Sequence, residues 1–193
     1  MFADSKKRKV GFLGCSSSFR TAPIDDPEWE LWACGPAMRW YPDAIDFFDV
    51  WFELHDMCDN DPEYGAVIDA LYYQWLEEAS KTKTVIYRPP LYKALVGEII
   101  PWDGLASKHA PYFLDSTIAW MMALAYENHD NIDEIGLWGI DFSSDIERRE
   151  QQKGTRHFIE LFRLQGINCF IPETSEMAHN PAPYPDYARK KAA

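Results

Sequence analysis

A glycine, three hydroxyls and a guanidinium follow the first apolar run of the sequence, at Gly14, Ser16, Ser17, Ser18 and Arg20. Glycine lets a ligand approach the backbone closely, and hydroxyl and guanidinium groups bind phosphate or carboxylate oxygens. The segment matches neither the GxGxxG pattern nor the lysine-containing phosphate loop. We therefore expect these residues to bind a phosphate or a nucleotide, and the alternative is a solvated turn or helix cap.

Titratable side chains end another apolar run, at Glu53, His55 and Asp56. Alternation along a strand places Glu53 and His55 on one face, with Asp56 at the following turn. A histidine beside carboxylates can hold a pKa suited to proton transfer near neutral pH. We expect His55 or Asp56 to be catalytic and Glu53 to bind ligand. The alternative is that His55 is hydrogen-bonded and anchors the end of the strand.

The segment 59–61 (DND) fits an acidic pattern that holds a divalent metal in many transferases. It directly precedes Pro62, at a position where acidic side chains cap a helix. We expect capping, and the sequence predicts neither a metal nor another cofactor. A hydrolase or phosphotransferase that holds a metal with Glu53, Asp56 and Asp141 is the alternative.

Further candidate ligand-binding residues lie next to predicted helices and strands. Ser116 and Thr117 begin an apolar helix, where they offer hydroxyls to a ligand, unless Ser116 only caps the helix. Asp141 ends the most apolar strand and Glu173 follows the last strand. We expect each carboxylate to accept a hydrogen bond from a ribose or sugar hydroxyl. Because the carboxyl ends of parallel strands share one edge, we expect Asp141 and Glu173 to converge with Ser16 and Glu53.

Short apolar runs alternate with helical segments along the chain. The predicted strands cover residues 9–14, 30–35, 50–55, 84–87, 134–141 and 168–171. The predicted helices cover residues 62–80, about 115–128 and 145–164. Such alternation is typical of an α/β fold, here a Rossmann-like, mostly parallel sheet with helices on both faces.

The predicted domain organisation is one α/β domain over residues 1–178, followed by an extended, proline-rich tail over 179–193. Between residues 91 and 112 we expect an irregular, lid-like loop with one or two short turns, because Pro101 and Pro111 limit any helix.

Composition excludes several classes of protein. A net charge of −12 argues against a nucleic-acid binder, which needs clustered Lys and Arg. No apolar stretch reaches the roughly 18 residues of a membrane helix, and the start of the chain lacks the pattern of a signal peptide. The four cysteines form no CxxC pair, so we expect reduced thiols. These features indicate a cytoplasmic protein.

Much of the chain resembles a family of small proteins encoded by tailed phages and prophages, which has no established activity. The matching segments are GFLGCSSSF, DDPEWELWACGPA, DVWFELHD, DSTIAWMMALAYENHDNIDEIGLWGIDF and GINCFIPETSEM. This resemblance implies a phage protein in the cytoplasm of an infected or lysogenic bacterium.

The helix start at residues 116–117, the alanine-rich helix and the strand EIGLWGID are more distantly similar to bacterial sialyltransferases and to hydroxymethylpterin diphosphokinase-like proteins. Those folds bind a nucleotide at this edge. The resemblance implies a ligand surrounded by Gly14, Ser16, Ser17, Ser116 and Asp141.

Two functions follow as hypotheses. The first is a nucleotide- or nucleotide-sugar-binding protein of phage type, with glycosyltransferase-like activity. The second is a non-catalytic accessory protein that binds a host protein or sequesters a host nucleotide signal. Eight Trp and ten Tyr suit the protein-binding alternative, because aromatic side chains anchor interfaces.

Overall fold

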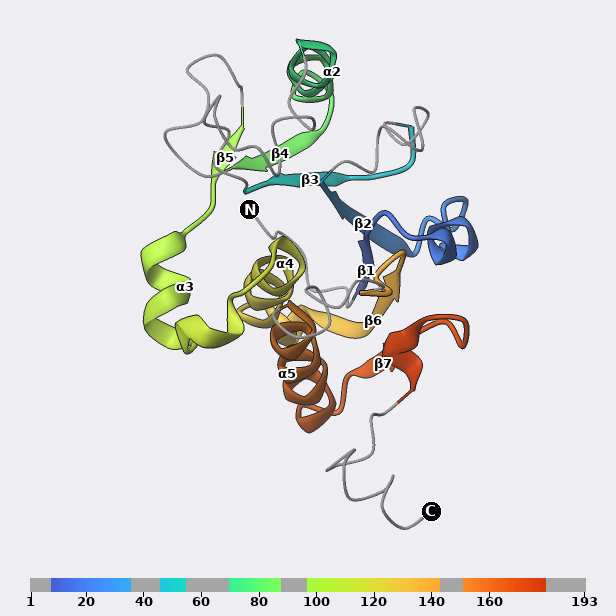
Figure 1. Cartoon of the computed structure of the whole chain (residues 1–193), viewed down its shortest axis with the longest axis vertical. Coiled ribbons are helices and arrows are strands. Elements are labelled where there is room, and N and C mark those ends of the chain that lie inside the picture. Colours follow the sequence, from blue (N-terminus) through green and yellow to red (C-terminus); the bar gives the residue numbers. More distant parts are fainter. Residues whose placement is uncertain (1–7, 36–45, 55–69, 88–96, 143–150, 180–193) are drawn as a thin grey trace, which may run out of the picture.

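Parallel strands form one twisted sheet in the computed structural model, which describes residues 8–35, 46–54, 70–87, 97–142 and 151–179 (Figure 1). The described strands are β1 (Arg8–Leu13), β2 (Trp29–Cys34), β3 (Val50–Glu53), β4 (Thr84–Tyr87), β5 (Glu98–Ile99), β6 (Ile132–Trp138) and β7 (Asn168–Phe170). Their order is β5-β4-β3-β2-β1-β6-β7, and all neighbours pair in parallel. The order therefore reverses between β1 and β6.

Helices cover both faces of this sheet, which confirms the predicted α/β, Rossmann-like fold. The described α-helices are α2 (Ala70–Ala79), α3 (Trp102–Lys108), α4 (Thr117–Tyr126) and α5 (Gln152–Leu164). Figure 1 shows α4 and α5 on one side of the sheet and α2 on the other. The short 3₁₀ helix η1 (Ser17–Thr21) lies with α2, because Phe19 packs in the same core as Leu76.

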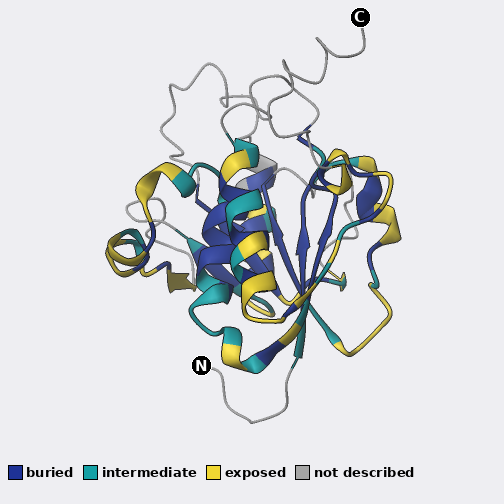
Figure 2. Ribbon diagram, turned by 90° about the horizontal axis from the view of Figure 1, so that it is seen from below, coloured by how far each residue is buried: buried dark blue, intermediate teal, exposed yellow. Residues whose placement is uncertain are grey.

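The core under α4 and α5 is built around a helix that is buried on nearly all sides. Ala119, Ala123 and Ala125 have no exposed surface, and neither do Met121 and Met122. Small alanines let α4 approach the strands, and the flexible methionines fill the space that remains. Figure 2 shows α4 buried against the strands, with the exposed residues of α5 on its outer side.

The core under α2 is strongly aromatic. Trp51 of β3 packs against Trp75 of α2 with ring centroids 4.6 Å apart, and Phe48 lies 4.9 Å from Trp51. These large rings fill the space between α2 and the sheet, whereas on the other face small alanines let α4 lie close to the strands. The two faces of one sheet therefore carry cores of different composition.

Two predictions about secondary structure were wrong. The segment expected to be irregular contains β5 and the two-turn helix α3. Pro101 does not prevent α3, because it occupies the N-cap, where no backbone N–H is needed inside the helix. Strand β6 ends at Trp138 rather than Asp141, because Gly139 takes a φ of +68° and turns the chain out of the sheet.

Several predicted segments lie outside the described residues. These are the start of the helix over 62–80, the start of the helix over 145–164 and the proline-rich tail after residue 179. The other predicted strands and the helix beginning at Ser116 agree with the structure to within three residues. Across the described ranges, no helix is long and apolar enough to cross a membrane.

Candidate functional site

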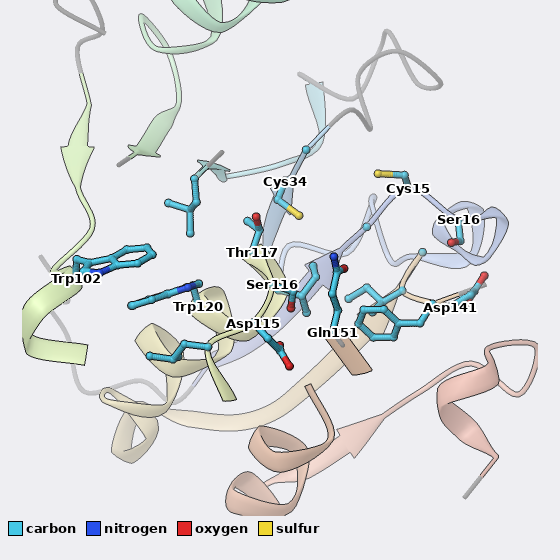
Figure 3. A pocket seen from close by; sticks show the side chains of 18 residues that line it. Cys15, Ser16, Cys34, Trp102, Asp115, Ser116, Thr117, Trp120, Asp141 and Gln151 are labelled. Atoms are coloured by element: carbon cyan, nitrogen blue, oxygen red, sulfur yellow. The ribbon is translucent and has the colours of Figure 1, made fainter. Parts of the chain in front are cut away.

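A cavity of about 350 Å³ opens at the carboxyl edge of the sheet, where the strand order reverses. The segments that follow β1, β2, β3 and β6 line it together with α3, the start of α4 and the start of α5 (Figure 3). In open α/β sheets the loops on either side of a reversal diverge, and ligands bind in the resulting crevice. The position of the cavity thus marks it as the candidate site.

Two glycines bring the loops after β1 and β6 into direct backbone contact. The N–H of Gly14 donates to the carbonyl of Trp138 at 2.8 Å, and that of Ser16 donates to the carbonyl of Gly139 at 2.9 Å. A Cβ atom on Gly139 would lie 2.7 Å from the Gly14 oxygen, closer than real Cβ contacts allow. These loops therefore form a rigid wall of the cavity that only glycine permits.

Asp141 lines the cavity beside this wall, and a buried serine holds its side chain. The Ser18 hydroxyl donates to Asp141 Oδ1 at 3.1 Å and accepts from the Gly139 N–H at 2.8 Å. Ser18 is only 4% exposed, so this link is shielded from water. Phe142 follows with a φ of +48°, a left-handed conformation that costs energy for a non-glycine residue. The loop thus fixes the carboxylate in place.

The start of α4 forms the middle of the cavity. The Ser116 hydroxyl oxygen accepts from the Ala119 N–H at 3.2 Å, which confirms Ser116 as the N-cap. The first N–H groups of a helix have no partner within that helix, and the helix dipole favours a negative charge beside them. Ser116, Thr117 and Ile118 all line the cavity. This part of the site is suited to an anion or a hydrogen-bond acceptor.

Asp115, directly before the N-cap of α4, also lines the cavity, although no sequence motif singled it out. The Gly154 N–H of α5 donates to Asp115 Oδ2 at 3.3 Å, so the carboxyl group is turned toward α5. Burial raises its pKa to about 6, although the bonds from Gly154 and Ser116 and the charge of Lys153 oppose that rise. Asp115 therefore positions the start of α5 beside the cavity.

Aromatic and aliphatic side chains form the other end of the cavity. Trp102 of α3 stacks on Trp120 of α4, and Leu54 and Leu114 line the cavity with them. Figure 3 shows the two indoles at one end, and Ser16 and Asp141 at the opposite end. No sequence motif indicated this apolar wall, because Trp102 lies in the segment that was expected to be irregular.

The fold is similar to that of a sialyltransferase. That protein is CstII from Campylobacter jejuni, in a structure with a substrate analogue, cytidine-5'-monophosphate. The two chains are 13% identical with a TM-score of 0.51, over 89% of this chain and 82% of that chain. No family model and no curated protein matches this chain. The predicted similarity to bacterial sialyltransferases is confirmed for the fold, and the resemblances to phage and pterin-kinase-like proteins stay predictions.

The structure brings part of the predicted ligand-binding set together. The predicted residues that line the cavity are Gly14, Ser16, Ser116, Thr117 and Asp141. Ser18 supports Asp141 from behind, and Ser17, Arg20 and Glu173 are exposed and do not line the cavity. The proposed catalytic residues His55 and Asp56 and the segment 59–61 lie outside the described residues.

Glu53 lies at the same sheet edge, but its side chain points to the other face. Leu54 belongs to the core under α4, so alternation along β3 directs Glu53 toward α2. There Glu53 is 1% exposed and accepts a hydrogen bond from Tyr72, whose hydroxyl also accepts from Trp51 Nε1 at 3.3 Å. The expected convergence of Glu53 with Asp141 is therefore not found.

The described lining of the cavity carries acidic groups and no basic side chain. Asp115 and Asp141 are its ionisable carboxyls, and Lys, Arg and His are absent from the lining residues that the structure describes. Within the same described ranges, no three His, Cys, Asp or Glu side chains group closely enough to hold a metal ion. Burial raises the pKa of the Cys34 thiol well above its usual value, so this lining cysteine stays protonated. The described lining therefore offers amides, hydroxyls and carboxylates as its polar groups.

Proposed function

We propose that the chain binds a nucleotide or a nucleotide sugar in the cavity between β1 and β6 and acts as a glycosyltransferase-like enzyme. The observation that carries the proposal is the place of the cavity at the reversal of strand order. Nucleotide-binding α/β sheets use this crevice, because the diverging loops leave room for the ligand and helix N-termini face it.

The start of α4 is the proposed phosphate position. Its N–H groups and the hydroxyls of Ser116, Thr117 and Ser16 can donate to phosphate oxygens without a lysine or an arginine. A nucleotide monophosphate or a single bridging phosphate suits such a site better than a long polyphosphate, because Asp115 and Asp141 add negative charge nearby.

Asp141 is the proposed acceptor for the ribose hydroxyls. The bond from Ser18 uses Oδ1, and a carboxylate has further acceptor positions on both oxygens for a vicinal diol. Because the Ser18 link and the Phe142 backbone hold this carboxylate before binding, little conformational entropy is lost when a ribose is bound. This arrangement orients the nucleoside toward the β1 and β6 end of the cavity.

The likeness of the fold to a sialyltransferase solved with cytidine-5'-monophosphate supports a cytidine nucleotide as the first ligand to test. Catalysis remains part of the proposal, with His55 or Asp56 as the base that takes a proton from an acceptor hydroxyl. The supporting observation is their place in the sequence, directly after β3 and Leu54, which lines the cavity.

Isothermal titration calorimetry and thermal shift with CMP, UMP, their sugar conjugates and cyclic dinucleotides, with and without magnesium, test this function. A bound ligand at about 100 times its Kd stabilises the fold by roughly 2.7 kcal/mol. We expect a shift with a cytidine or uridine compound. Binding of only a cyclic dinucleotide would indicate sequestration of a signal, and a flat panel would contradict nucleotide binding.

A matched pair of variants locates the ligand. Asp141→Asn removes the charge that lines the cavity, and Glu173→Gln makes the same chemical change at an exposed residue outside it. We expect Asp141→Asn to weaken nucleotide binding about 10-fold, since hydrogen bonds to charged groups contribute about 1.5–3 kcal/mol. Glu173→Gln should leave the affinity unchanged, and equal effects of both variants would contradict the placement.

A further inference from the structure

Two tryptophans form a flat, rigid end to the cavity. Trp102 is the first residue of α3 and Trp120 lies in the first turn of α4. Their ring centroids are 3.7 Å apart and the planes meet at 21°, so the two indoles are stacked. Trp120 is only 5% exposed and belongs to the core, whereas Trp102 is partly buried and packs against it. The core thus holds Trp120 in place, and Trp120 in turn holds Trp102.

The chemistry around these indoles changes along the cavity. Leu54 and Leu114 extend the apolar surface, while Thr117 and Gln151 bring hydrogen-bonding groups to the middle of the cavity. Figure 3 shows Thr117 and Gln151 between the indoles and the loop that carries Ser16. This end of the cavity is therefore complementary to a ligand that has one flat apolar face and polar groups at its rim.

The orientation of this ligand rests on the proposed nucleotide site. With the ribose at Asp141 and the phosphate at the start of α4, the nucleoside occupies the end of the cavity away from the indoles. The group that is linked to the phosphate, or the acceptor molecule to which that group is transferred, then lies toward Trp102 and Trp120 (Figure 3). Figure 3 shows Asp141 and the indoles at opposite ends of the cavity, so the ribose and the group at the indoles are different parts of the bound ligands.

We propose that Trp102, supported from behind by the buried Trp120, forms the subsite for a pyranose ring. The apolar C–H face of such a ring packs on an aromatic surface, and its hydroxyls at the rim bond to polar side chains. The ring comes either from the donor, linked to the nucleotide phosphate, or from a saccharide acceptor. Both sources present the same face to the indoles, so one surface recognises either of them.

Two leucine variants distinguish a binding role of Trp102 from a purely structural one. Trp102→Leu removes the platform, and Trp29→Leu removes a partly buried tryptophan that also begins its element and packs edge-on against Trp138 at 5.0 Å. Trp29 begins β2 and so lies at the opposite edge of the sheet from the cavity. Trp102→Phe keeps an aromatic surface, and thermal melting of each variant establishes that it is folded.

Titration calorimetry measures the affinity of each variant for CMP, UMP, CMP-sialic acid, UDP-glucose and UDP-galactose, and saturation-transfer NMR measures binding of free lactose and glucose. We expect Trp102→Leu to weaken the binding of at least one pyranose-containing ligand about 10-fold, which is the effect expected from the loss of one aromatic contact. Binding of the sugar-free nucleotide should stay within about 2-fold, because the indoles do not touch it. Trp102→Phe should retain most of the affinity, and Trp29→Leu should change none of it.

Comparing the nucleotide sugars with the free saccharides identifies the source of the pyranose ring. Loss confined to a nucleotide sugar assigns the subsite to the donor, and loss confined to a free saccharide assigns it to the acceptor. Equal weakening of nucleotide and nucleotide sugar by Trp102→Leu would overturn the proposal, as would unchanged binding of every pyranose. If no nucleotide binds but a saccharide depends on Trp102, the nucleotide function fails while the pyranose subsite stands. If neither class binds the wild-type protein, both proposals are overturned.

Discussion

Glu53 ends β3 and Asp141 follows β6, so these two carboxylates lie at the same edge of the sheet, yet their surroundings differ. Glu53 is 1% exposed in the aromatic core under α2, with Tyr72 as a hydrogen-bond donor. Asp141 lines the cavity and is held by Ser18. The comparison shows that a position at a strand end does not decide whether an acid is buried in the core or lines the cavity. The face toward which its side chain points decides that.

The two faces differ in how they end at this edge. Under α2, the large rings of Trp51, Tyr72 and Trp75 fill the space up to the end of β3. Under α4, the helix starts at Thr117 beside the ends of the strands, and the space above its first turn remains as the cavity. One face is therefore closed by bulky side chains, and the other is hollow where a helix begins.

Gly14→Ala should have the largest effect on the cavity face. Its methyl group would overlap the carbonyl group of Gly139, and backbone on both sides leaves little room to relax. We expect a loss of about 3 kcal/mol in the free energy of unfolding, the upper range for overpacking. Urea denaturation measures it, and loss of nucleotide binding should accompany it.

Gly104→Ala is the control for this prediction. Gly104 is exposed within α3, and an added methyl group there meets no atom within 4 Å. Alanine should raise stability by about 0.5–1 kcal/mol, because glycine loses more backbone entropy in a helix. Equal destabilisation by both variants would show that the two loops are not in the close contact described.

Tyr72→Phe tests the opposite face. It removes the hydroxyl that donates to the buried Glu53 and accepts from Trp51, while the ring volume is kept. We expect the free energy of unfolding to fall by about 2 kcal/mol, within the range for an unsatisfied buried group. Nucleotide affinity should remain unchanged below the melting transition. A large loss of affinity without loss of stability would mean that Glu53 serves the ligand site after all.

Asp115→Asn should give the smallest effect, confined to pH dependence. Because the folded-state pKa of about 6 lies above the ordinary value of 3.8 for an aspartate, ionisation of Asp115 opposes folding. Its destabilising contribution is absent at about pH 3, grows as the pH rises from about 4 to 6, and is complete above that range. The melting temperature of Asp115→Asn relative to wild type should therefore rise across this window.

Asp25→Asn, a change at an exposed aspartate outside the cavity, is the matched control and should show no such rise. Differential scanning calorimetry from pH 4 to 7 provides the measurement. A relative melting temperature of Asp115→Asn that is constant over this range would show that the Asp115 carboxyl is not desolvated in the folded protein.

Local patterns were sufficient to predict most of the framework. The apolar runs at β1, β2, β3, β4, β6 and β7, and the hydroxyl cap at Ser116, are short-range features, because burial and capping impose them on consecutive residues. The same patterns predicted that Ser16 and Asp141 lie at one edge, since parallel strands must end together, although Glu53 and Glu173, predicted with them, do not line the cavity. The sequence alone thus determined the fold class and the edge that holds the cavity.

Only the tertiary structure decided which side chains share that cavity. The direction of Glu53 depends on the pleat of β3, the link from Ser18 to Asp141 joins residues 123 positions apart, and the stacking of Trp102 on Trp120 depends on where α3 packs. Such contacts form between segments whose relative position no local pattern contains, because it follows from packing of the whole core. For this protein, the sequence determined which edge of the sheet holds the cavity, and packing decided the walls of that cavity.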